Sequence, residues 1–525
     1  MRKIIIGTRG SELALWQANY TKSALEKLGH EVELKIISTQ GDRTQQWNTS
    51  FDKLEGKGFF TKELEEELLA GAIDLAVHSH KDLPTQNPEG LIIAAVSQRE
   101  DPCDLLLIRK EALDPKRKFQ LKVNALVGTS SARRKSQLLA FRDDLKLEDL
   151  RGNVPTRINK LREGKYDAIL LAYAGIERLG IQLDEFHAEK MDPKEFVPAP
   201  AQGVLAWQIR EKDKDLFTIL QQLNDEDVAL STGLERKILN LFEGGCQMPL
   251  GAYCEIDTDD DYRRLFKIWT AVADAWDKQP KQLYFETSVI DGFPEQVVEK
   301  IKNIKAKKVF ITRNLRESDY FYKALKRLSF ESTGQSLIEF KLIEIKSLPI
   351  SEWIFFSSKH AVKYFFNQQP KIGKVKFACV GKATAQELRS FGHKADFIGQ
   401  NTDTKFIGKQ FSSLAGNAKV LFPIAKESMQ SIQQQLTKKE NAINLPVYQT
   451  IKHSIEVPAD MDVIVFTSPS NVDAFFEKNK LRPHQKAVAM GDATAKALER
   501  KGVRKCGQPI SFDDLGLVQA VLYLS

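Results

Sequence analysis

Residues 3–38, KIIIGTRGSELALWQANYTKSALEKLGHEVELKIIS, decide the fold of the first part of the chain. The apolar run at residues 3–8 predicts a β-strand, and residues 12–29 have the apolar spacing of an amphipathic helix. Gly29 stands where glycine commonly ends a helix, and residues 31–38 predict a second strand. A strand, a helix and a strand in this order are typical of an α/β fold.

The same alternation continues to about residue 220. We expect further strands at residues 73–79, 124–130 and 166–175, and helices at 61–71 and 132–141. The stretch at 40–60 is long, polar and contains glycines, which predicts a mobile loop or lid.

The pattern changes between residues 222 and 300. A helical stretch at 228–245 precedes Cys246, and strands are expected at 266–276 and 282–290. These features predict a small α+β unit, and the lysine-rich stretch at 300–308 predicts a domain boundary.

The last part of the chain contains an internal repeat. WIFFSSKHAVKYFF (353–366) aligns with VIVFTSPSNVDAFF (463–476), and VGKATAQELRSFG (380–392) aligns with MGDATAKALERKG (490–502), both at an offset of 110 positions. The repeat predicts two similar α/β domains, with any ligand at the carboxyl ends of the strands. A duplication that serves folding alone and a shared binding cleft both explain it.

Chain length and charge limit the possible classes of protein. A chain of 525 residues is too long for one hydrophobic core, so about three to five domains are expected. No apolar run is long enough for a membrane span, and the first residues lack the apolar region of a signal peptide. The net charge of +7 favours anionic ligands without singling out nucleic acid.

The cysteines argue against a disulfide framework. They are odd in number and scattered, at positions 103, 246, 254, 379 and 506. No CxxC occurs, so a structural zinc site is not expected. We expect a cytoplasmic protein.

Several arginines follow predicted strand ends or helix starts, where α/β proteins bind their ligands. They are Arg9, Arg133, Arg134, Arg151, Arg157 and Arg178. In VGTSSARRKS (127–136), free backbone N–H groups, hydroxyls and two guanidiniums suit an anion, and arginine suits a carboxylate. Surface salt bridges are the alternative.

The stretch VHSHKDLP (77–84) places Lys81 and Asp82 at a predicted strand end. Asp82 suits a general acid or base, or a stabiliser of positive charge, although an aspartate that only shapes the turn is equally compatible. His78 and His80 would share one strand face, but the sequence offers no third metal ligand nearby.

Cys246 follows Gly244 and Gly245 where a helix is expected to end. A small buried thiol is one interpretation. An exposed, reactive thiolate is the other, and a cysteine protease would also need a histidine base that the sequence does not reveal.

Together these motifs resemble one family over residues 1–300. The stretches GTRGSELALWQA, GKGFFTKELEEELL, AVHSHKDLPT, VGTSSARRKSQL, LRGNVPTRINKL, PAPAQG and FEGGCQMPLGAY occur in the order found in hydroxymethylbilane synthase, also called porphobilinogen deaminase. Residues 306–525 resemble uroporphyrinogen-III synthase through two F-[ST]-S loops, two G-x-A-T-A loops and LPVYQT (445–450).

The resemblance implies an α/β architecture of five domains. The first half would hold two periplasmic-binding-protein-like α/β domains and a small α+β domain with the cofactor cysteine, and the second half two similar α/β domains. The implied boundaries are 1–101 plus 202–220, 102–201, 221–300, 306–340 plus 452–525, and 341–451.

The resemblance also implies a chemistry. A dipyrromethane cofactor would be bound through a thioether to Cys246. Four porphobilinogen units would lose ammonia in turn, each giving an electrophilic azafulvene that the growing chain attacks, and hydrolysis would release hydroxymethylbilane. Asp82 and Lys81 match the catalytic positions, where Asp82 would stabilise charge on pyrrole nitrogens and move protons.

Further residues match binding positions of the family. The cofactor-binding positions are Ser79, Lys81, Thr129, Ser131, Arg133, Arg134, Gly152 and Arg157. The substrate-binding positions are Arg9, Ser11, Phe60, Arg151, Arg157, Arg178 and Gln202. We expect no metal site.

The second half would cyclise the linear tetrapyrrole to uroporphyrinogen III, inverting the last ring with loss of water. Its cleft would include Ser358, Thr384, Tyr448, Thr467, Ser468 and Thr494. The loop GDAT (491–494) departs from the usual Pro-Thr pattern, so an active deaminase with weak or no cyclase activity is the alternative.

Other classes of protein fit less well. A solute-binding protein would share the fold of the first half but would need an export signal, and a nucleic-acid-binding protein would need a basic helix or a zinc motif. We expect a monomer that binds porphobilinogen and a linear tetrapyrrole, without nucleic-acid or membrane partners.

Overall fold

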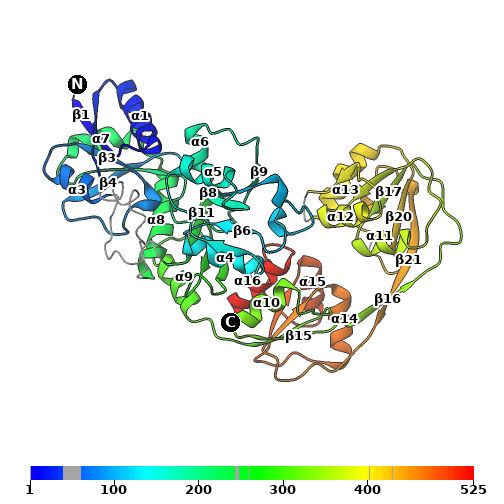
Figure 1. Cartoon of the computed structure of the whole chain (residues 1–525). Coiled ribbons are helices and arrows are strands. Elements are labelled where there is room, and N and C mark those ends of the chain that lie inside the picture. The colour runs from blue at the N-terminus through cyan, green and yellow to red at the C-terminus, as the bar shows by residue number, and fades with distance from the viewer. Residues whose placement is uncertain (1, 40–60, 243–247, 259–260, 401–402, 429) are drawn as a thin grey trace. The chain divides into compact units, whose positions relative to one another are not determined.

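The computed structural model describes residues 2–39, 61–242, 248–258, 261–400, 403–428 and 430–525. The described chain divides into two compact units (Figure 1). The first unit comprises Met1–Lys308, Arg316–Ser332 and Gly507–Ser525, and the second comprises Val309–Leu315 and Thr333–Cys506.

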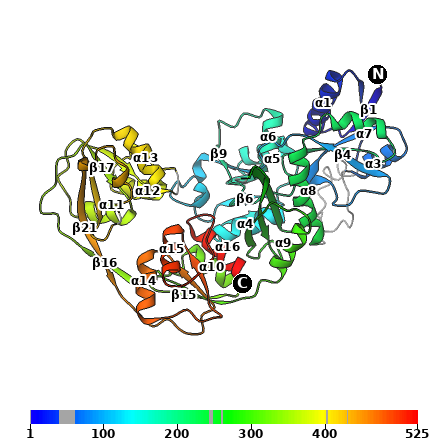
Figure 2. The same cartoon turned by 180° about the vertical axis from the view of Figure 1, so that it is seen from behind.

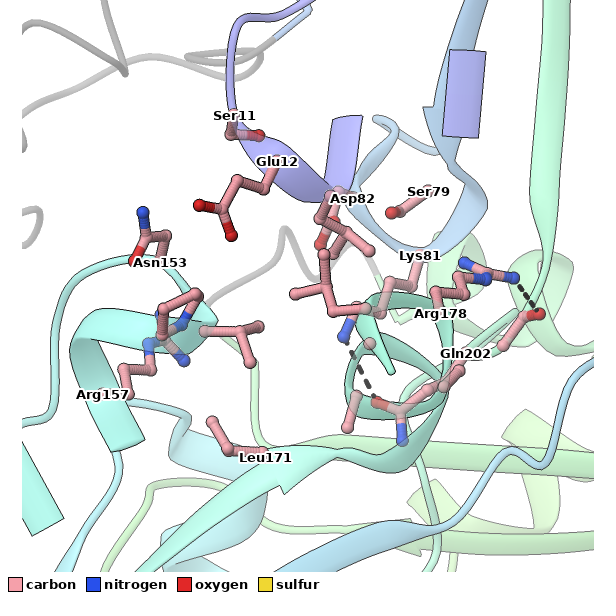
Figure 3. A pocket seen from close by; sticks show the side chains of 18 of the residues that line it. Ser11, Glu12, Ser79, Lys81, Asp82, Asn153, Arg157, Leu171, Arg178 and Gln202 are labelled. Atoms are coloured by element: carbon pink, nitrogen blue, oxygen red, sulfur yellow. Dashed lines mark hydrogen bonds between the residues drawn. The ribbon is translucent and has the colours of Figure 1, made fainter. Parts of the chain in front are cut away.

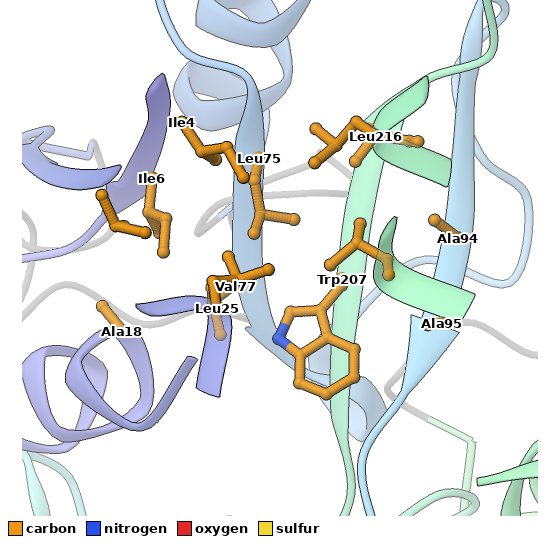
Figure 4. Close-up of a cluster of buried hydrophobic side chains, with 13 residues drawn as sticks. Ile4, Ile6, Ala18, Leu25, Leu75, Val77, Ala94, Ala95, Trp207 and Leu216 are labelled. Atoms are coloured by element: carbon orange, nitrogen blue, oxygen red, sulfur yellow. The ribbon is translucent and has the colours of Figure 1, made fainter. Parts of the chain in front are cut away.

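The first sheet of the first unit has five strands. Their order is β2 (Glu31–Ile36), β1 (Lys3–Thr8), β3 (Leu75–Ser79), β10 (Leu205–Arg210) and β4 (Leu91–Val96). Strand β10 is antiparallel to both neighbours, whereas β1 runs parallel to β2 and β3. Ile6, Leu25, Val77 and Trp207 lie in the core between this sheet and helices α1 (Glu12–Lys27) and α7 (Lys214–Gln221) (Figure 4).

The second sheet repeats this arrangement. Its order is β7 (Lys146–Glu148), β6 (Leu126–Gly128), β8 (Ala168–Ala172), β5 (Asp104–Ile108) and β9 (His187–Lys190). Strand β5 is the antiparallel member, as β10 is in the first sheet. Strands β1–β4 and β10 form the first sheet and β5–β9 form the second. The chain therefore crosses to the second sheet after β4 and returns to the first with β10. The expected pair of periplasmic-binding-protein-like α/β domains is confirmed.

The third part of the first unit is an antiparallel sheet with helices. Strands β11 (Leu250–Thr258), β12 (Arg264–Val272) and β13 (Lys281–Thr287) pair in sequence order. Helices α8 (Glu226–Leu241) and α9 (Phe293–Lys302) accompany them. This is the small α+β unit predicted for residues 222–300.

Two further sheets belong to the C-terminal half. One has the order β15 (Glu331–Gly334), β14 (Lys308–Ile311), β22 (Val463–Phe466) and β23 (Lys486–Ala489). The other has the order β16 (Ile338–Leu342), β21 (Ala442–Lys452), β20 (Val420–Ala425), β17 (Trp353–Phe356), β18 (Lys376–Cys379) and β19 (Phe397–Ile398).

The internal repeat is visible in the structure. Strand β17, helix α11 (Lys359–Phe366), β18 and α12 (Lys382–Ser390) correspond to β22, α14 (Pro469–Lys478), β23 and α15 (Asp492–Arg500). Ser358 and Ser468 cap the equivalent helices α11 and α14. The sequence offset of 110 positions therefore reflects two similar α/β domains.

Two local predictions were wrong. The strand expected at 166–175 ends at Ala172, and Tyr173 begins helix α6 (Tyr173–Leu179). A short buried apolar run does not distinguish a strand from a helix, so its end was not visible in the sequence. The second error concerns His80, which does not share a strand face with His78, because β3 ends at Ser79 and His80 begins a 3₁₀ turn.

The described residues offer neither a metal site nor a membrane span. No group of three or more His, Cys, Asp or Glu side chains there could hold a metal ion. Among the same residues, no helix is long and apolar enough to cross a membrane. The five domain boundaries stay a prediction.

Candidate active site

A pocket of about 370 Å³ lies between the two five-stranded sheets of the first unit (Figure 3). Elements of both α/β domains line it. The polar and charged lining residues are Arg9, Ser11, Glu12, Ser79, Lys81, Asp82, Arg134, Asn153, Arg157, Arg178 and Gln202. This pocket gathers most of the residues that the sequence analysis selected.

The turn after β3 brings Lys81 and Asp82 to the pocket. Lys81 Nζ lies 3.5 Å from Gln202 Oε1, and Asp82 is exposed (Figure 3). Burial lowers the pKa of Lys81 to about 8, although the negative charge of Asp82 opposes this shift. Lys81 is therefore a charged ammonium group at neutral pH, and it loses its proton when the pH rises past about 8.

Helix α8 (Glu226–Leu241) holds this turn through the side chain of Arg236. Arg236 on α8 donates to the carbonyl oxygens of His80 at 2.9 Å, Leu83 at 3.2 Å and Pro84 at 2.5 Å. Hydrogen bonds from a charged donor are stronger than neutral ones, so the turn is firmly fixed at both of its ends.

Asp104, the first residue of β5, organises the arginines of helix α4 (Ala132–Phe141). Its fully buried carboxylate lies 2.7 Å from Arg133 Nη1 and 2.7 Å from Arg134 Nη2. Gln202 Nε2 donates to it at 3.1 Å. Burial favours the neutral acid, but the two guanidiniums prevail and hold the pKa of Asp104 far below its usual range.

The positive charge of the site exceeds its negative charge. One carboxylate, Asp104, serves both Arg133 and Arg134. Arg157 Nε donates to the Gly152 carbonyl at 2.7 Å, and burial lowers the pKa of Arg157 to about 10. Arg178 Nη2 donates to the Gly203 carbonyl at 2.8 Å, and its buried Nε has no hydrogen-bond partner among the described residues.

This charge balance suits an anionic ligand. Burying a charge costs free energy unless it is paired, and the site offers more buried guanidiniums than carboxylates. Guanidiniums bind carboxylates through two parallel hydrogen bonds, so a ligand with several carboxylates matches the donor set.

The predicted residues fall into three groups. Arg9, Ser11, Ser79, Lys81, Asp82, Arg134, Gly152, Arg157, Arg178 and Gln202 line the pocket. Thr129, Ser131, Arg133 and Arg151 do not line it. Cys246, Phe60 and the loop at 40–60 lie outside the described residues.

Three of the residues that do not line the pocket stabilise the elements next to it: Arg133, Ser131 and Thr129. Arg133 is buried and also donates to the Val197 carbonyl at 2.9 Å. Ser131 caps helix α4 by accepting from the backbone N–H of Arg134, and the Thr129 hydroxyl accepts from the Ser131 N–H at 3.3 Å. Their proposed ligand contacts stay predictions.

Sequence reasoning missed Glu12, Asn153 and Asp104. Asn153 caps helix α5 (Val154–Arg162) inside the motif that supplied Arg151 and Arg157. Asp104 had a visible signal, because a single carboxylate opens the otherwise apolar run DLLLI (104–108). A charge is rarely placed at the start of a buried strand unless it has a partner.

In the C-terminal half, one predicted pair is in contact. The Ser358 and Tyr448 hydroxyls lie 3.3 Å apart, and burial raises the pKa of Tyr448. The Thr467 hydroxyl donates to the Thr312 carbonyl at 3.0 Å, while Ser468 caps α14. Thr384 and Thr494 are buried at equivalent places in α12 and α15. Their roles in a cleft stay predictions.

Comparison with known proteins gives two family matches. Residues 4–218 match the model "Porphobilinogen deaminase, dipyromethane cofactor binding domain", and residues 319–519 match "Uroporphyrinogen-III synthase HemD". The porphobilinogen deaminase of a Nitratiruptor species is 46% identical over 260 residues, which cover 49% of this chain and 81% of that protein. That of Sulfurimonas denitrificans is 46% identical over 262 residues, covering 49% and 81%.

Among solved structures, the uroporphyrinogen-III synthetase of Helicobacter pylori 26695 aligns with 42% of this chain and 100% of its own. Its sequence identity is 17% and its TM-score is 0.33.

The fold, the arginine-lined pocket and the two matches define an enzyme of tetrapyrrole biosynthesis with two catalytic parts. The chain belongs to the porphobilinogen deaminase family, and a uroporphyrinogen-III synthase domain follows the deaminase part. The resemblance noted in the sequence is confirmed, as is the expectation of a dipyrromethane cofactor.

Proposed function

We propose that the first half joins four porphobilinogen molecules on a dipyrromethane bound to Cys246 Sγ, with loss of one ammonia for each, and that hydrolysis by one water releases hydroxymethylbilane. The second half then closes this product to uroporphyrinogen III with inversion of the last ring. The observation that carries the proposal is that one pocket is lined by Lys81 and Asp82 together with Arg134 and Arg157.

The donor set fits the cofactor. Each pyrrole ring bears an acetate and a propionate, and the pocket supplies Arg9, Arg134, Arg157 and Arg178 as partners for such carboxylates. Arg133 would act mainly by sharing Asp104, which keeps the Arg134 guanidinium in place. When bound, the dipyrromethane supplies the pyrrole carbon from which the chain grows.

Asp82 is the residue that acts on the reacting pyrroles. Its exposed carboxylate accepts a hydrogen bond from a pyrrole N–H and stabilises the positive charge that develops on this nitrogen. It also moves the proton that the chemistry requires. Lys81, next to it and near Gln202, holds a substrate carboxylate and offsets the negative charge of Asp82.

Intact mass of the purified protein tests the attachment. The wild type should exceed the sequence mass by one dipyrromethane, and Cys246→Ala should remove the increment. Cys506→Ala is the matched control, because Cys506 is a half-exposed free thiol in the second unit. A folded wild type expressed with ample porphobilinogen but without the extra mass would overturn the proposal.

The products test the second half. Incubation with porphobilinogen should give uroporphyrinogen III as the main isomer. If only the symmetric type I isomer forms while porphobilinogen is consumed, residues 306–525 do not cyclise with inversion.

We further propose that the enzyme acts as a monomer in the cytoplasm. The cysteines in the described residues are free thiols, as is usual in a reducing compartment. Gel filtration should give a mass near 59.4 kDa, and a dimer mass would contradict the monomer.

A further inference from the structure

Two helices of the synthase match lie in the compact unit of the deaminase. Helix α10 (Tyr320–Arg327) stands at the start of the matched residues 319–519, and α16 (Asp514–Leu524) stands at their end. Both belong to the first unit, where α16 packs against β13 and α10. Figure 2 shows α10 and α16 next to each other.

Helix α16 is mostly apolar, and its residues from Leu515 to Leu522 are all buried, as expected for a helix that other parts of the protein surround. Leu517, Val521 and Leu522 are fully buried. At its end, the ring of Tyr523 meets Phe285 of β13 edge-on at 5.9 Å. Lys300 of α9 lies 5.7 Å from the Tyr523 ring centre.

Helix α10 contacts the second α/β domain and the small domain of the deaminase. Tyr320 stacks on Phe141 of α4 with 5.0 Å between ring centres and 15° between planes. Its hydroxyl donates to Gln282 Oε1 of β13 at 3.3 Å. The Phe321 N–H donates to Asp514 at 3.1 Å, which joins α10 to α16.

Charged residues surround these apolar contacts. Arg327 Nη2 lies 2.7 Å from Asp143 Oδ2, and Lys323 Nζ lies 3.2 Å from the same oxygen. Arg327 Nη1 also donates to the Leu139 carbonyl at 3.1 Å. An apolar, aromatic centre with a polar rim is the usual composition of a protein–protein interface.

We propose that α10 and α16 form an internal docking surface that holds the synthase part on the deaminase part. The partner of this surface is α4 together with β13. The two catalytic parts then remain associated through packing, and the connection at residues 303–307 is not needed to keep them together.

Cutting this connection in the purified full-length protein tests the proposal. A protease site placed at residues 303–307, between α9 and β14, gives two fragments, the second of which contains both helices. The fragments should elute together at the position of the uncut protein when diluted to micromolar concentration. Separate elution of two folded fragments would overturn the proposal.

Substitutions identify the contact. Tyr320→Ala removes the stack on Phe141 and the bond to Gln282, so it should raise the dissociation constant of the cut fragments at least tenfold. Tyr262→Ala is the matched control, because Tyr262 is 92% exposed, and it should leave the constant unchanged. An unchanged constant in Tyr320→Ala would contradict the proposal.

If Tyr320→Ala does not fold, the contact is tested by exchanging the charges of Asp143 and Arg327. Asp143→Arg should weaken association, because it places positive charge against Arg327 and Lys323. Adding Arg327→Glu should recover most of the loss. Equal affinity in the single and double variants would contradict the assigned contact, and deaminase turnover in each variant reports that the first part is folded.

Discussion

At the scale of single residues, Asp104 controls the charge of the pocket without lining it. Its carboxylate is fully buried and pairs with two guanidiniums. Asp104→Asn removes the charge and leaves Arg133 and Arg134 buried without it. Breaking a buried ion pair in this way costs about 3–5 kcal/mol. Urea unfolding at pH 7 should show a loss of this size.

The pH dependence of this effect has a definite sign. The pKa of Asp104 is lowered in the folded protein, so its stabilisation is present above about pH 4, the usual range of a free aspartate, and is lost as pH falls through the folded pKa. Asp149→Asn is the control, since the Asp149 carboxylate is 45% exposed in its pair with Lys135. A loss no larger than that of Asp149→Asn would contradict the role of Asp104.

Lys81 gives a second prediction at this scale. Its pKa of about 8 means that the ammonium charge disappears as pH rises from 7 to 9. Because this charge attracts the substrate carboxylates, kcat/KM should fall on the alkaline side with an apparent pKa near 8.

Lys81→Arg provides the test, since a guanidinium keeps its charge throughout this range. Its alkaline decline should shift to higher pH, whatever the absolute rate. Lys165→Arg, at a side chain that is 60% exposed, should keep the wild-type profile. A Lys81→Arg profile identical to the wild type would exclude Lys81 as the titrating group.

The sequence predicted the residues that line the pocket better than the buried residues that hold them in place. Arg134, Arg157 and Asp82 lie in motifs at strand ends, and the topology of an α/β sheet brings such ends together. The pairing of Asp104 with α4 joins residues far apart in sequence, and a composition pattern carries no information about such a contact. Ser131 and Asn153 act as helix caps, a role that their residue types alone already favour.

At the scale of elements, helix α8 connects the parts of the deaminase. Glu235 is fully buried and accepts from Arg99 Nη1 at 2.6 Å and from the backbone N–H groups of Ala201 and Cys254 at 2.6 and 2.8 Å. Its neighbour Arg236 holds the turn that carries Asp82. The helix that leads toward Cys246 is thus bonded directly to the turn with the acid.

Arg236→Gln should therefore impair catalysis more than binding. The turn loses the charged donor at its carbonyls, and small misplacements of a catalytic group reduce the rate strongly, here by about tenfold or more in kcat. KM should stay within about twofold, because other arginines hold the substrate carboxylates.

The neighbouring change Lys237→Gln serves as the control, since Lys237 forms a half-exposed pair with Glu295. Both variants are compared by steady-state kinetics and by the mass increment of the cofactor. A rise in KM with normal kcat in Arg236→Gln would instead make Arg236 a binding residue.

The elements themselves were largely predictable, but some ends were not. The repeat at 110 positions identified equivalent strands and helices because both copies keep a serine cap and a glycine before the next helix. The end of β8 at Ala172 was missed because the apolar run continues into α6 without a break.

At the scale of the whole molecule, sequence patterns and packing assign α10 and α16 differently. The synthase match at residues 319–519 includes α10 and the first half of α16, whereas the packing of both helices places them in the deaminase unit. This difference could not be predicted, because it depends on a surface that forms only when α4 and β13 are folded.

The packing has a consequence for stability. Removal of residues 514–525 should destabilise the deaminase, although the deletion lies far from it in sequence. Burial of Leu517, Val521 and Leu522 alone contributes about 5 kcal/mol at the usual value for large apolar side chains. Heat inactivation of porphobilinogen consumption should shift down by about 5 °C or more.

A shorter deletion separates packing from mere shortening of the chain. Removing only residues 523–525 takes away Tyr523, which is 53% exposed, and keeps the buried part of α16. This variant loses the edge contact of Tyr523 with Phe285 but keeps the buried residues Leu515–Leu522, so its inactivation temperature should fall by much less than that of the longer deletion. If both deletions leave the inactivation temperature of the deaminase unchanged, α16 does not stabilise the unit in which it lies. The packing of α16 against β13 would then contribute nothing to the free energy of unfolding.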